Sequence, residues 1–269
     1  MPLLRLFYLQ HTVLKKQTAH SHTSVDYKSE KLKPYEGQND KTAQVEQMFN
    51  SIAPAYDFMN HAMTLGIDKL WRRTAVRMIA KAQPKHILDV ATGTGDFAID
   101  LCHKLGPESI VGLDLTAGML EVARRKVARL GLDGVISFKQ GNCMEMDFAD
   151  GQFDAITVAF GVRNFEHIEE CYHEMLRVLK PGGTLCVIEL SVPRNPVIRF
   201  FYNLYAMHII PTLGGLKSHD KSAYRYLPQS IAAAPQGEKM LEIMRRTGFG
   251  KCAWRRLTMG VCSIYTAVK

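Results

Sequence analysis

The chain has 269 residues, of which 46% are hydrophobic, and this length suits one generous domain with appendages. Its 34 basic and 26 acidic residues give a net charge of +8, which is compatible with an anionic surface or cofactor as partner. The six cysteines form no C-x-x-C pair and no run of about 18 apolar residues occurs. We therefore expect a cytoplasmic protein with reduced thiols, without a zinc site of paired cysteines and without a transmembrane helix.

The first part of the chain, residues 1–40, is polar, rich in Lys and His and without periodicity. We expect it to be a disordered N-terminal extension rather than a targeting peptide, since its apolar part is short and interrupted. From there, one domain is predicted over 41–269. Apolar residues recur at helical spacing over 41–82, which predicts a helical lid that precedes the sheet.

The period of the sequence changes after the lid. Short apolar runs now alternate with helical patterns, which is typical of a mainly parallel sheet covered by helices on both faces. The strands are predicted at 86–91, 109–114, 135–140, 153–160 and 184–190, and the helices between them at 95–105, 116–130 and 168–179.

The C-terminal part of the sequence is helical at first and ends in two β runs. Only Met259 and Gly260 separate 251–258 from 261–268, so these runs predict an antiparallel hairpin. The predicted fold is α/β and Rossmann-like, with a mainly parallel seven-stranded sheet, helices on both faces and a terminal antiparallel hairpin. Helices are predicted at 195–213, 221–233 and 235–247, and the segment 195–233 forms a second helical lid.

A glycine turn follows the first predicted strand. Gly93 and Gly95 let the backbone approach a ligand closely, and the stretch G-T-G-D-F-A also fits a dinucleotide fingerprint. Asp114 ends the second strand, where a carboxylate can accept both ribose hydroxyls, and Asn142 follows the third strand, where an amide can bind an adenine edge. Asp89 can bind an amino group but would repel a pyrophosphate. With the terminal hairpin, these residues favour S-adenosylmethionine over a nicotinamide dinucleotide. The alternatives are a plain strand-to-helix turn for the glycines, a helix N-cap for Asp114 and a turn residue for Asn142.

Several stretches together resemble known methyltransferases. One set is similar to the motif series of class I S-adenosylmethionine-dependent methyltransferases, and a second set resembles the quinone-biosynthesis C-methyltransferase family. That family acts on demethylmenaquinol and on a ubiquinol precursor. The first set is DVATGTGD (89–96), GLDLTAGML (112–120), GNCMEMDF (141–148) and LKPGG (179–183), and the second set is 49–73, 160–165, 221–231 and 260–265.

The resemblance implies an activity, a cofactor and a pathway. It implies methyl transfer from S-adenosylmethionine to a ring carbon of demethylmenaquinol, the last step of menaquinone biosynthesis. The alternative is a ubiquinone-pathway or dual-specificity 2-methoxy-6-polyprenyl-1,4-benzoquinol methyltransferase. Asn142 and Ala159 favour the first, because many relatives in the ubiquinone pathway have an acid and a serine there. By motif match, the resemblance places cofactor contacts at Thr94, Asp114, Asn142 and Cys143.

The chemistry of such a transfer requires a ring carbon made nucleophilic by a hydroxyl that loses its proton, and it requires no metal. Arg163 and Asn164 directly follow the fourth strand, where a guanidinium can stabilise a quinolate. Asp57 is a candidate proton acceptor in the first lid. These three are the predicted catalytic residues. Tyr56 and Asn60 in the first lid, with Tyr224 and Arg225 in the second, are the predicted substrate contacts.

The implied substrate is a prenylated naphthoquinol lipid, so the enzyme must meet a membrane surface. The apolar stretch 195–216 can lie against lipid, line a channel for the tail or form a core helix. The positive charge favours an anionic surface on the inner face of the cell membrane. Nucleic acid is not an expected partner, since the chain has no Pro-Cys dipeptide and no basic run interleaved with aromatic residues. A non-catalytic cofactor-binding scaffold and a homodimer are left open.

Overall fold

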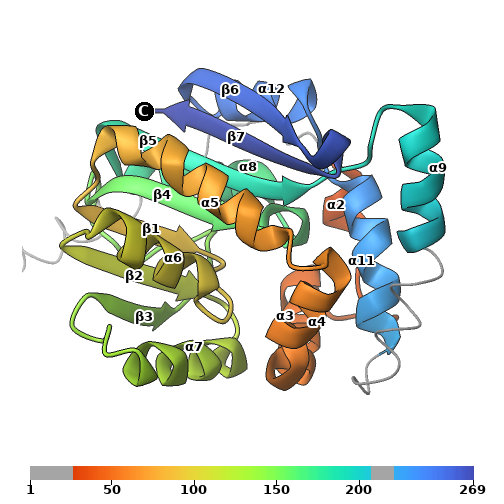
Figure 1. The fold of residues 1–269 in the computed structure, drawn as a ribbon, viewed down its shortest axis with the longest axis horizontal. Coiled ribbons are helices and arrows are strands. Elements are labelled where there is room, and N and C mark those ends of the chain that lie inside the picture. Colours follow the sequence, from red (N-terminus) through yellow and green to blue (C-terminus); the bar gives the residue numbers. More distant parts are fainter. Residues whose placement is uncertain (1–26, 207–220) are drawn as a thin grey trace, which may run out of the picture.

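The fold is built on one twisted sheet (Figure 1). The structure, a computed structural model, describes residues 27–206 and 221–269. In this part of the chain the sheet has seven strands in the order β3-β2-β1-β4-β5-β7-β6, and β7 is antiparallel to both of its neighbours. The predicted fold class and terminal hairpin are confirmed. The strands are β1 (His86–Val90), β2 (Ser109–Asp114), β3 (Ile136–Gln140), β4 (Phe153–Ala159), β5 (Leu179–Leu190), β6 (Gly250–Leu257) and β7 (Cys262–Val268).

The predicted strand boundaries agree with the structure closely except at β5. This strand begins at Leu179, which pairs with Phe153, and its regular pairing resumes only where Thr184 meets Ala155. Gly182 has a φ of +78° in the irregular stretch between them. The Pro-Gly-Gly sequence therefore makes a break inside the strand, whose predicted start was residue 184, because glycine adopts this backbone without strain.

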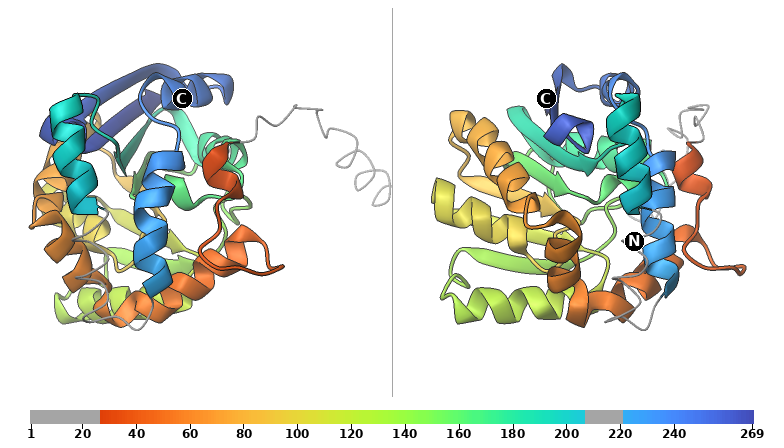
Figure 2. Two further views of the ribbon diagram at one scale, coloured as in Figure 1. Left: turned by 90° about the vertical axis from the view of Figure 1, so that its right-hand side faces the viewer. Right: turned by 45° about the vertical axis from the view of Figure 1, so that its right-hand side comes forward.

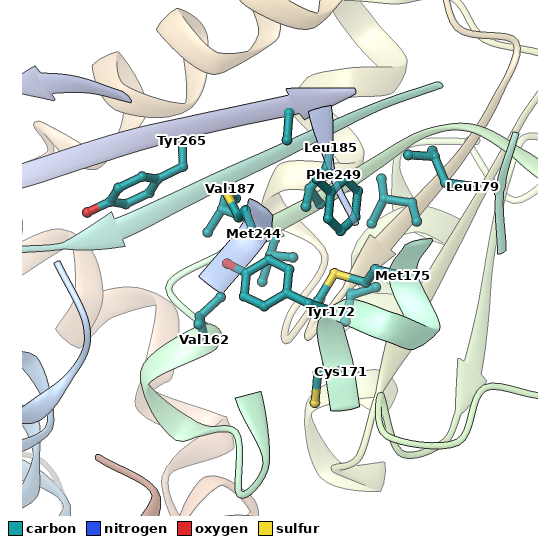
Figure 3. Close-up of a cluster of buried hydrophobic side chains, with 14 of the residues drawn as sticks. Val162, Cys171, Tyr172, Met175, Leu179, Leu185, Val187, Met244, Phe249 and Tyr265 are labelled. Carbon is teal, nitrogen blue, oxygen red and sulfur yellow. The ribbon is translucent and has the colours of Figure 1, made fainter. Parts of the chain in front are cut away.

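Helices cover both faces of the sheet, as predicted. On one face α5 (Asp68–Ile79), α6 (Asp96–Leu105) and α7 (Ala117–Arg129) bury apolar side chains against the strands. On the other face α8 (Ile168–Val178) and α12 (Glu238–Arg246) do the same. Figure 3 shows the centre of this second core, where Tyr172 and Met175 of α8 face Phe249 and strand β5.

Further helices form a separate layer beyond the sheet. They are α3 (Lys41–Ile52), α4 (Tyr56–Thr64), α9 (Pro196–Leu204) and α11 (Lys221–Ala233), and α3, α4 and α11 share a third apolar cluster. Two views place α9 and α11 side by side along one flank of the molecule (Figures 1 and 2). The predicted first lid is shorter than 41–82, because α5 packs on the sheet. The described residues also form four short 3-10 helices: η1 (Ala53–Ala55), η2 (Ala80–Ala82), η3 (Val162–Asn164) and η5 (Thr258–Gly260).

Residues 27–40 pack on the domain, so the prediction of disorder up to residue 40 is wrong for this part. A short helix, α2 (Lys28–Lys31), lies beside α11 and η3. The Tyr27 hydroxyl donates to Glu169 Oε1 at 2.6 Å, and Glu30 Oε1 accepts from the backbone N–H of Ile168 at 2.7 Å. Polar side chains attach this segment to the domain, and such contacts leave no apolar periodicity in the sequence. Residues 1–26 lie outside the described part of the chain.

The helical prediction for 195–213 is met by α9 as far as Leu204, and residues 207–220 lie outside the described part. Among the residues that the structure describes, no helix is both long and apolar enough to cross a membrane.

Candidate active site

Two adjoining cavities lie where the strands end and the lid helices begin. The sheet-end cavity, of about 100 Å³, is lined by the loops after β1, β2, β3 and β4 together with α3. The lid cavity, of about 370 Å³, is lined mainly by apolar and aromatic side chains of α3, α4, α9 and α11. Open α/β sheets bind ligands at the carboxyl ends of their strands, so both cavities are where the topology predicts a site.

The sheet-end cavity contains four of the predicted cofactor residues: Gly93, Asp114, Asn142 and Cys143. Asp114 Oδ2 accepts the N–H of Gly93 at 2.7 Å, and its Oδ1 accepts the N–H of Thr116 at 2.9 Å. Burial raises the pKa of Asp114, although both backbone N–H groups favour its ionised form. The two backbone hydrogen bonds fix this carboxylate at the cavity wall, where its remaining lone pairs can accept ribose hydroxyls.

Three other predicted cofactor residues do not line this cavity. Asp89 is buried, and its two oxygens accept the hydroxyls of Thr92 and Thr157, each at 2.6 Å. The Thr94 hydroxyl donates to Asp57, away from the cavity. Gly95 starts α6 with a φ of +81°. The structure thus places these residues where they shape the loop, and a direct cofactor contact for them remains a prediction.

Asp89 should make the stability of the protein depend on pH. Burial raises its pKa to about 6, against the hydrogen bonds from Thr157 and Thr92. The folded state holds the Asp89 proton more tightly than the unfolded chain does. The contribution of this proton to the free energy of unfolding is therefore full below about pH 4 and is lost as pH rises through about 6. We expect the free energy of unfolding of the wild type to fall by about 1–3 kcal/mol across this window relative to Asp89→Asn. Urea unfolding of both proteins at several pH values measures it, and parallel pH profiles would contradict it.

The loop after β4 has a tight backbone that positions two predicted catalytic residues. Phe160 has a left-handed φ of +59°, and a Cβ on Gly161 would lie 2.7 Å from the Cβ of Ala91. Only glycine permits this close approach between the loops after β4 and β1. The short helix η3 then directs Arg163 and Asn164 toward the lid cavity, whose wall contains both.

Arg163 is buried beside an acidic partner that sequence reasoning missed. It is 6% exposed, and its Nη1 donates to Glu189 Oε1 at 2.8 Å and to the carbonyl oxygen of Phe160. Burial lowers the pKa of Arg163, but the Glu189 carboxylate outweighs this and holds that pKa above its usual value. Glu189 is the only acidic residue of β5 and lies next to its last residue, and a lone acid in this part of the strand was the signal that could have revealed it. The result is a permanent, fixed positive charge at the cavity wall.

The predicted substrate contacts fall into two groups. Tyr56, Asn60 and Tyr224 line the lid cavity. Arg225 is exposed and outside the cavity wall, so the structure does not support its predicted role. The reason is helical geometry, since the residues of α11 that face the cavity recur three or four positions apart and Arg225 lies off that face.

Asp57 does not reach either cavity, which argues against its predicted role as proton acceptor. Its Oδ2 accepts from Lys126 Nζ at 2.8 Å, and its Oδ1 accepts the Thr94 hydroxyl. This ion pair joins α4 to α7 and to the loop after β1. A carboxylate held in this way fixes α4 to α7, and it is not among the residues that line the lid cavity.

The two cavities share part of their walls. Phe49, Tyr56, Phe160 and Asn164 line both. Arg163 is the only charged side chain among the described residues of the lid cavity. In the described part of the chain, no three His, Cys, Asp or Glu side chains gather as ligands for a metal ion. The arrangement therefore places the predicted nucleoside site next to an apolar cavity whose wall contains one guanidinium.

A sheet of this order, with its last strand inserted antiparallel and a cavity at the strand ends, is the fold of class I S-adenosylmethionine-dependent methyltransferases. The chain belongs to the ubiE/COQ5 methyltransferase family, whose model matches residues 37–269. S-adenosylmethionine is its methyl donor, and the carboxylate, amide and glycine loop of the sheet-end cavity fit that molecule.

Individual relatives agree with this assignment. The chain is 51% identical to a demethylmenaquinone methyltransferase of Bacteroides fragilis, over 91% of this chain and 100% of that protein. It is 39% identical to the ubiquinone/menaquinone biosynthesis C-methyltransferase UbiE of Geobacter sulfurreducens, over 91% of this chain and 95% of the relative. Among solved structures, the cyclase SpnF has the same fold, with a TM-score of 0.62 and 18% identity over 85% of this chain and 96% of the other.

Proposed function

We propose that this enzyme transfers a methyl group from S-adenosylmethionine to a ring carbon of demethylmenaquinol, in the last step of menaquinone biosynthesis. The relatives named demethylmenaquinone methyltransferase support this proposal. The observation that carries it is the lid cavity. It is large and apolar, shares a wall with the cofactor site and contains one buried guanidinium, which suits a prenylated aromatic diol.

The residues of the lid cavity perform the acceptor half of the reaction. S-adenosylmethionine, when bound, supplies an electrophilic methyl group on a sulfonium. Arg163 stabilises the negative charge that develops as an acceptor hydroxyl loses its proton, and Glu189 holds the guanidinium in place. The electron pair of the ring then forms the new carbon–carbon bond as the carbon–sulfur bond breaks. The electron pair of the broken carbon–sulfur bond stays on sulfur, which gives S-adenosylhomocysteine. The proton of the methylated ring carbon then moves to the oxygen that lost its own, which restores the aromatic diol, so the hydroxyl proton released to solvent is the net proton product.

The shared wall sets the geometry of the transfer. Tyr56 and Asn164 lie between the two cavities, so they can hold the ring against the methyl group at about 3–3.5 Å, the distance that an in-line transfer needs. Burial raises the pKa of Tyr56 to about 12, so its hydroxyl remains a neutral donor during the reaction. The aromatic lining excludes water, and this strengthens the interaction between Arg163 and the developing charge.

One experiment identifies which quinol is the methyl acceptor. The purified enzyme is incubated anaerobically with methyl-labelled S-adenosylmethionine and either demethylmenaquinol or a demethylated ubiquinol precursor. We expect label in the menaquinol product. Label in only the ubiquinol product would replace the proposed pathway with the alternative one, and label in both would establish dual specificity. Label in neither would contradict a quinol methyltransferase.

We further propose that α9 brings the enzyme to the membrane in which the substrate resides. Val197, Phe200 and Phe201 are 63%, 63% and 62% exposed, and Leu204 is 49% exposed. Phe201 also lines the lid cavity, so the exposed apolar surface continues into the site. The helix carries no acid and one basic residue, Arg199. An apolar surface of this kind at the mouth of a lipid site can extract a prenylated acceptor from an anionic bilayer.

Vesicle flotation tests this attachment. We expect the wild type to float with vesicles that contain anionic lipid, and the double variant with Val197→Ser and Phe200→Ser to bind at least about tenfold more weakly, because each change removes apolar area. Leu130→Ser is the matched control, since Leu130 is also exposed but lies at the end of α7. A wild type that stays with the soluble fraction, or a double variant that floats as well as the control, would contradict the proposal.

A further inference from the structure

Three buried polar atoms of the lid cavity region have no hydrogen-bond partner among the described residues. They are Arg163 Nε, Asn164 Oδ1 and the Tyr226 hydroxyl. A buried polar atom without a partner costs free energy, and native proteins keep few of them. Here all three belong to residues that line one cavity. Their common location indicates that a ligand with polar atoms completes them.

Tyr226 is the member of this set to which neither sequence nor motif assigns a role. It lies on α11 next to the exposed Arg225, is 3% exposed and lines the lid cavity. Its neighbours include the charged pair at the cavity wall, since Arg163 and Glu189 both act electrostatically on its hydroxyl. Burial raises the pKa of Tyr226, so the phenol stays protonated and can both donate and accept a hydrogen bond.

We infer that the Tyr226 hydroxyl binds an oxygen atom of the aromatic acceptor, alongside Arg163 and Asn164. The three atoms form a matched set: Nε–H is a donor, Oδ1 is an acceptor and the phenol is both. The amide orientation of Asn164 follows from its Nδ2, which faces the carbonyl oxygen of Phe160 at 3.5 Å. A ligand with two hydroxyl groups satisfies all three atoms. This assignment rests on the proposed function and adds a third polar contact to it.

Another buried tyrosine provides a matched control. Tyr265 lines neither cavity, and its hydroxyl already accepts the backbone N–H of Gly237 at 2.8 Å. Removing the hydroxyl of Tyr265 breaks a hydrogen bond of the free protein. Removing the hydroxyl of Tyr226 breaks no hydrogen bond that the described residues make. It also removes a buried polar atom that has no partner among them. The two tyrosines should therefore respond to phenylalanine with opposite changes in stability.

The test compares Tyr226→Phe, Tyr265→Phe and the wild type, with demethylmenaquinol as acceptor. For Tyr226→Phe we expect an unchanged or higher Tm without ligand and a roughly tenfold lower kcat/KM, because one hydrogen bond to the acceptor is lost. For Tyr265→Phe we expect a lower Tm and a kcat/KM within about threefold of the wild type. A purely structural role for Tyr226 would lower its Tm and leave kcat/KM unchanged.

The outcomes separate this inference from the function on which it rests. If the wild type transfers no methyl group to either quinol, the proposed function fails. If the wild type is active and Tyr226→Phe retains its kcat/KM, the function stands and the contact with Tyr226 is overturned. A lower Tm for Tyr226→Phe would also overturn the inference, because it would show that the hydroxyl has a partner within the free protein.

Discussion

Replacing Arg163 by lysine should lower kcat by about 10²- to 10³-fold, the size of effect seen when a preorganised donor to a developing oxyanion is removed. Lysine retains the positive charge that Glu189 requires, so the buried carboxylate keeps a partner and the protein should fold. It cannot reproduce the fork of the guanidinium, in which Nη1 is held by Glu189 while Nε remains for the acceptor.

The same variant should bind S-adenosylhomocysteine within a few-fold of the wild type, because Arg163 does not line the sheet-end cavity. Alanine is a poorer choice, since it leaves Glu189 charged, buried and unpaired at a cost of about 3–5 kcal/mol. Arg177→Lys is the control, as Arg177 pairs with Glu174 and Asp150 outside both cavities. A kcat for Arg163→Lys above about one tenth of the wild-type value would exclude the stabilising role given to Arg163.

Replacing Asp114 by asparagine should weaken binding of S-adenosylhomocysteine by about 100-fold. Two hydrogen bonds from ribose hydroxyls to a charged acceptor contribute about 1.5–3 kcal/mol each, and the amide retains only part of this. The amide also turns an NH₂ group toward one of the two backbone N–H donors, of Gly93 or Thr116, that now hold the carboxylate. Asparagine should therefore disturb both the contact and the loop that presents it.

Isothermal titration calorimetry with S-adenosylhomocysteine measures this loss. Asp133→Asn is the matched control, because Asp133 is exposed in the loop before β3 and lines neither cavity. At saturating cofactor, kcat should fall much less than the affinity, since Asp114 lies outside the lid cavity. An affinity within threefold of the wild type would show that the ribose is bound elsewhere.

The sheet, and the meeting of four predicted cofactor residues at the sheet-end cavity, could be predicted from the sequence, because both depend on local patterns. Short apolar runs that alternate with helical periods specify a covered parallel sheet. Asp114 is the last residue of β2, and Asn142 lies two residues after the end of β3. Polar residues at the ends of parallel strands necessarily meet at one edge. Their common position in the sheet-end cavity therefore follows from topology alone.

The acceptor site was harder to predict, because long-range side-chain pairing determines it. Nothing near Asp57 in sequence shows that Lys126 neutralises it from another helix. Nothing near Arg163 shows that Glu189 is its partner. On α11 the sequence singles out the charged Arg225, while burial places its neighbour Tyr226 at the cavity. The segment 27–40 was missed for the same reason, since a few polar contacts attach it to the domain.

The position of the transferred methyl group tests the central claim most directly. The enzyme is incubated anaerobically with demethylmenaquinol and S-adenosylmethionine that carries a carbon-13 methyl group, and the product is examined by carbon-13 NMR. Transfer across the shared wall of the two cavities, to a ring activated by Arg163, predicts a single labelled methyl group on the ring carbon next to a hydroxyl-bearing carbon. A labelled methyl group on oxygen, or an unlabelled acceptor, would contradict this account.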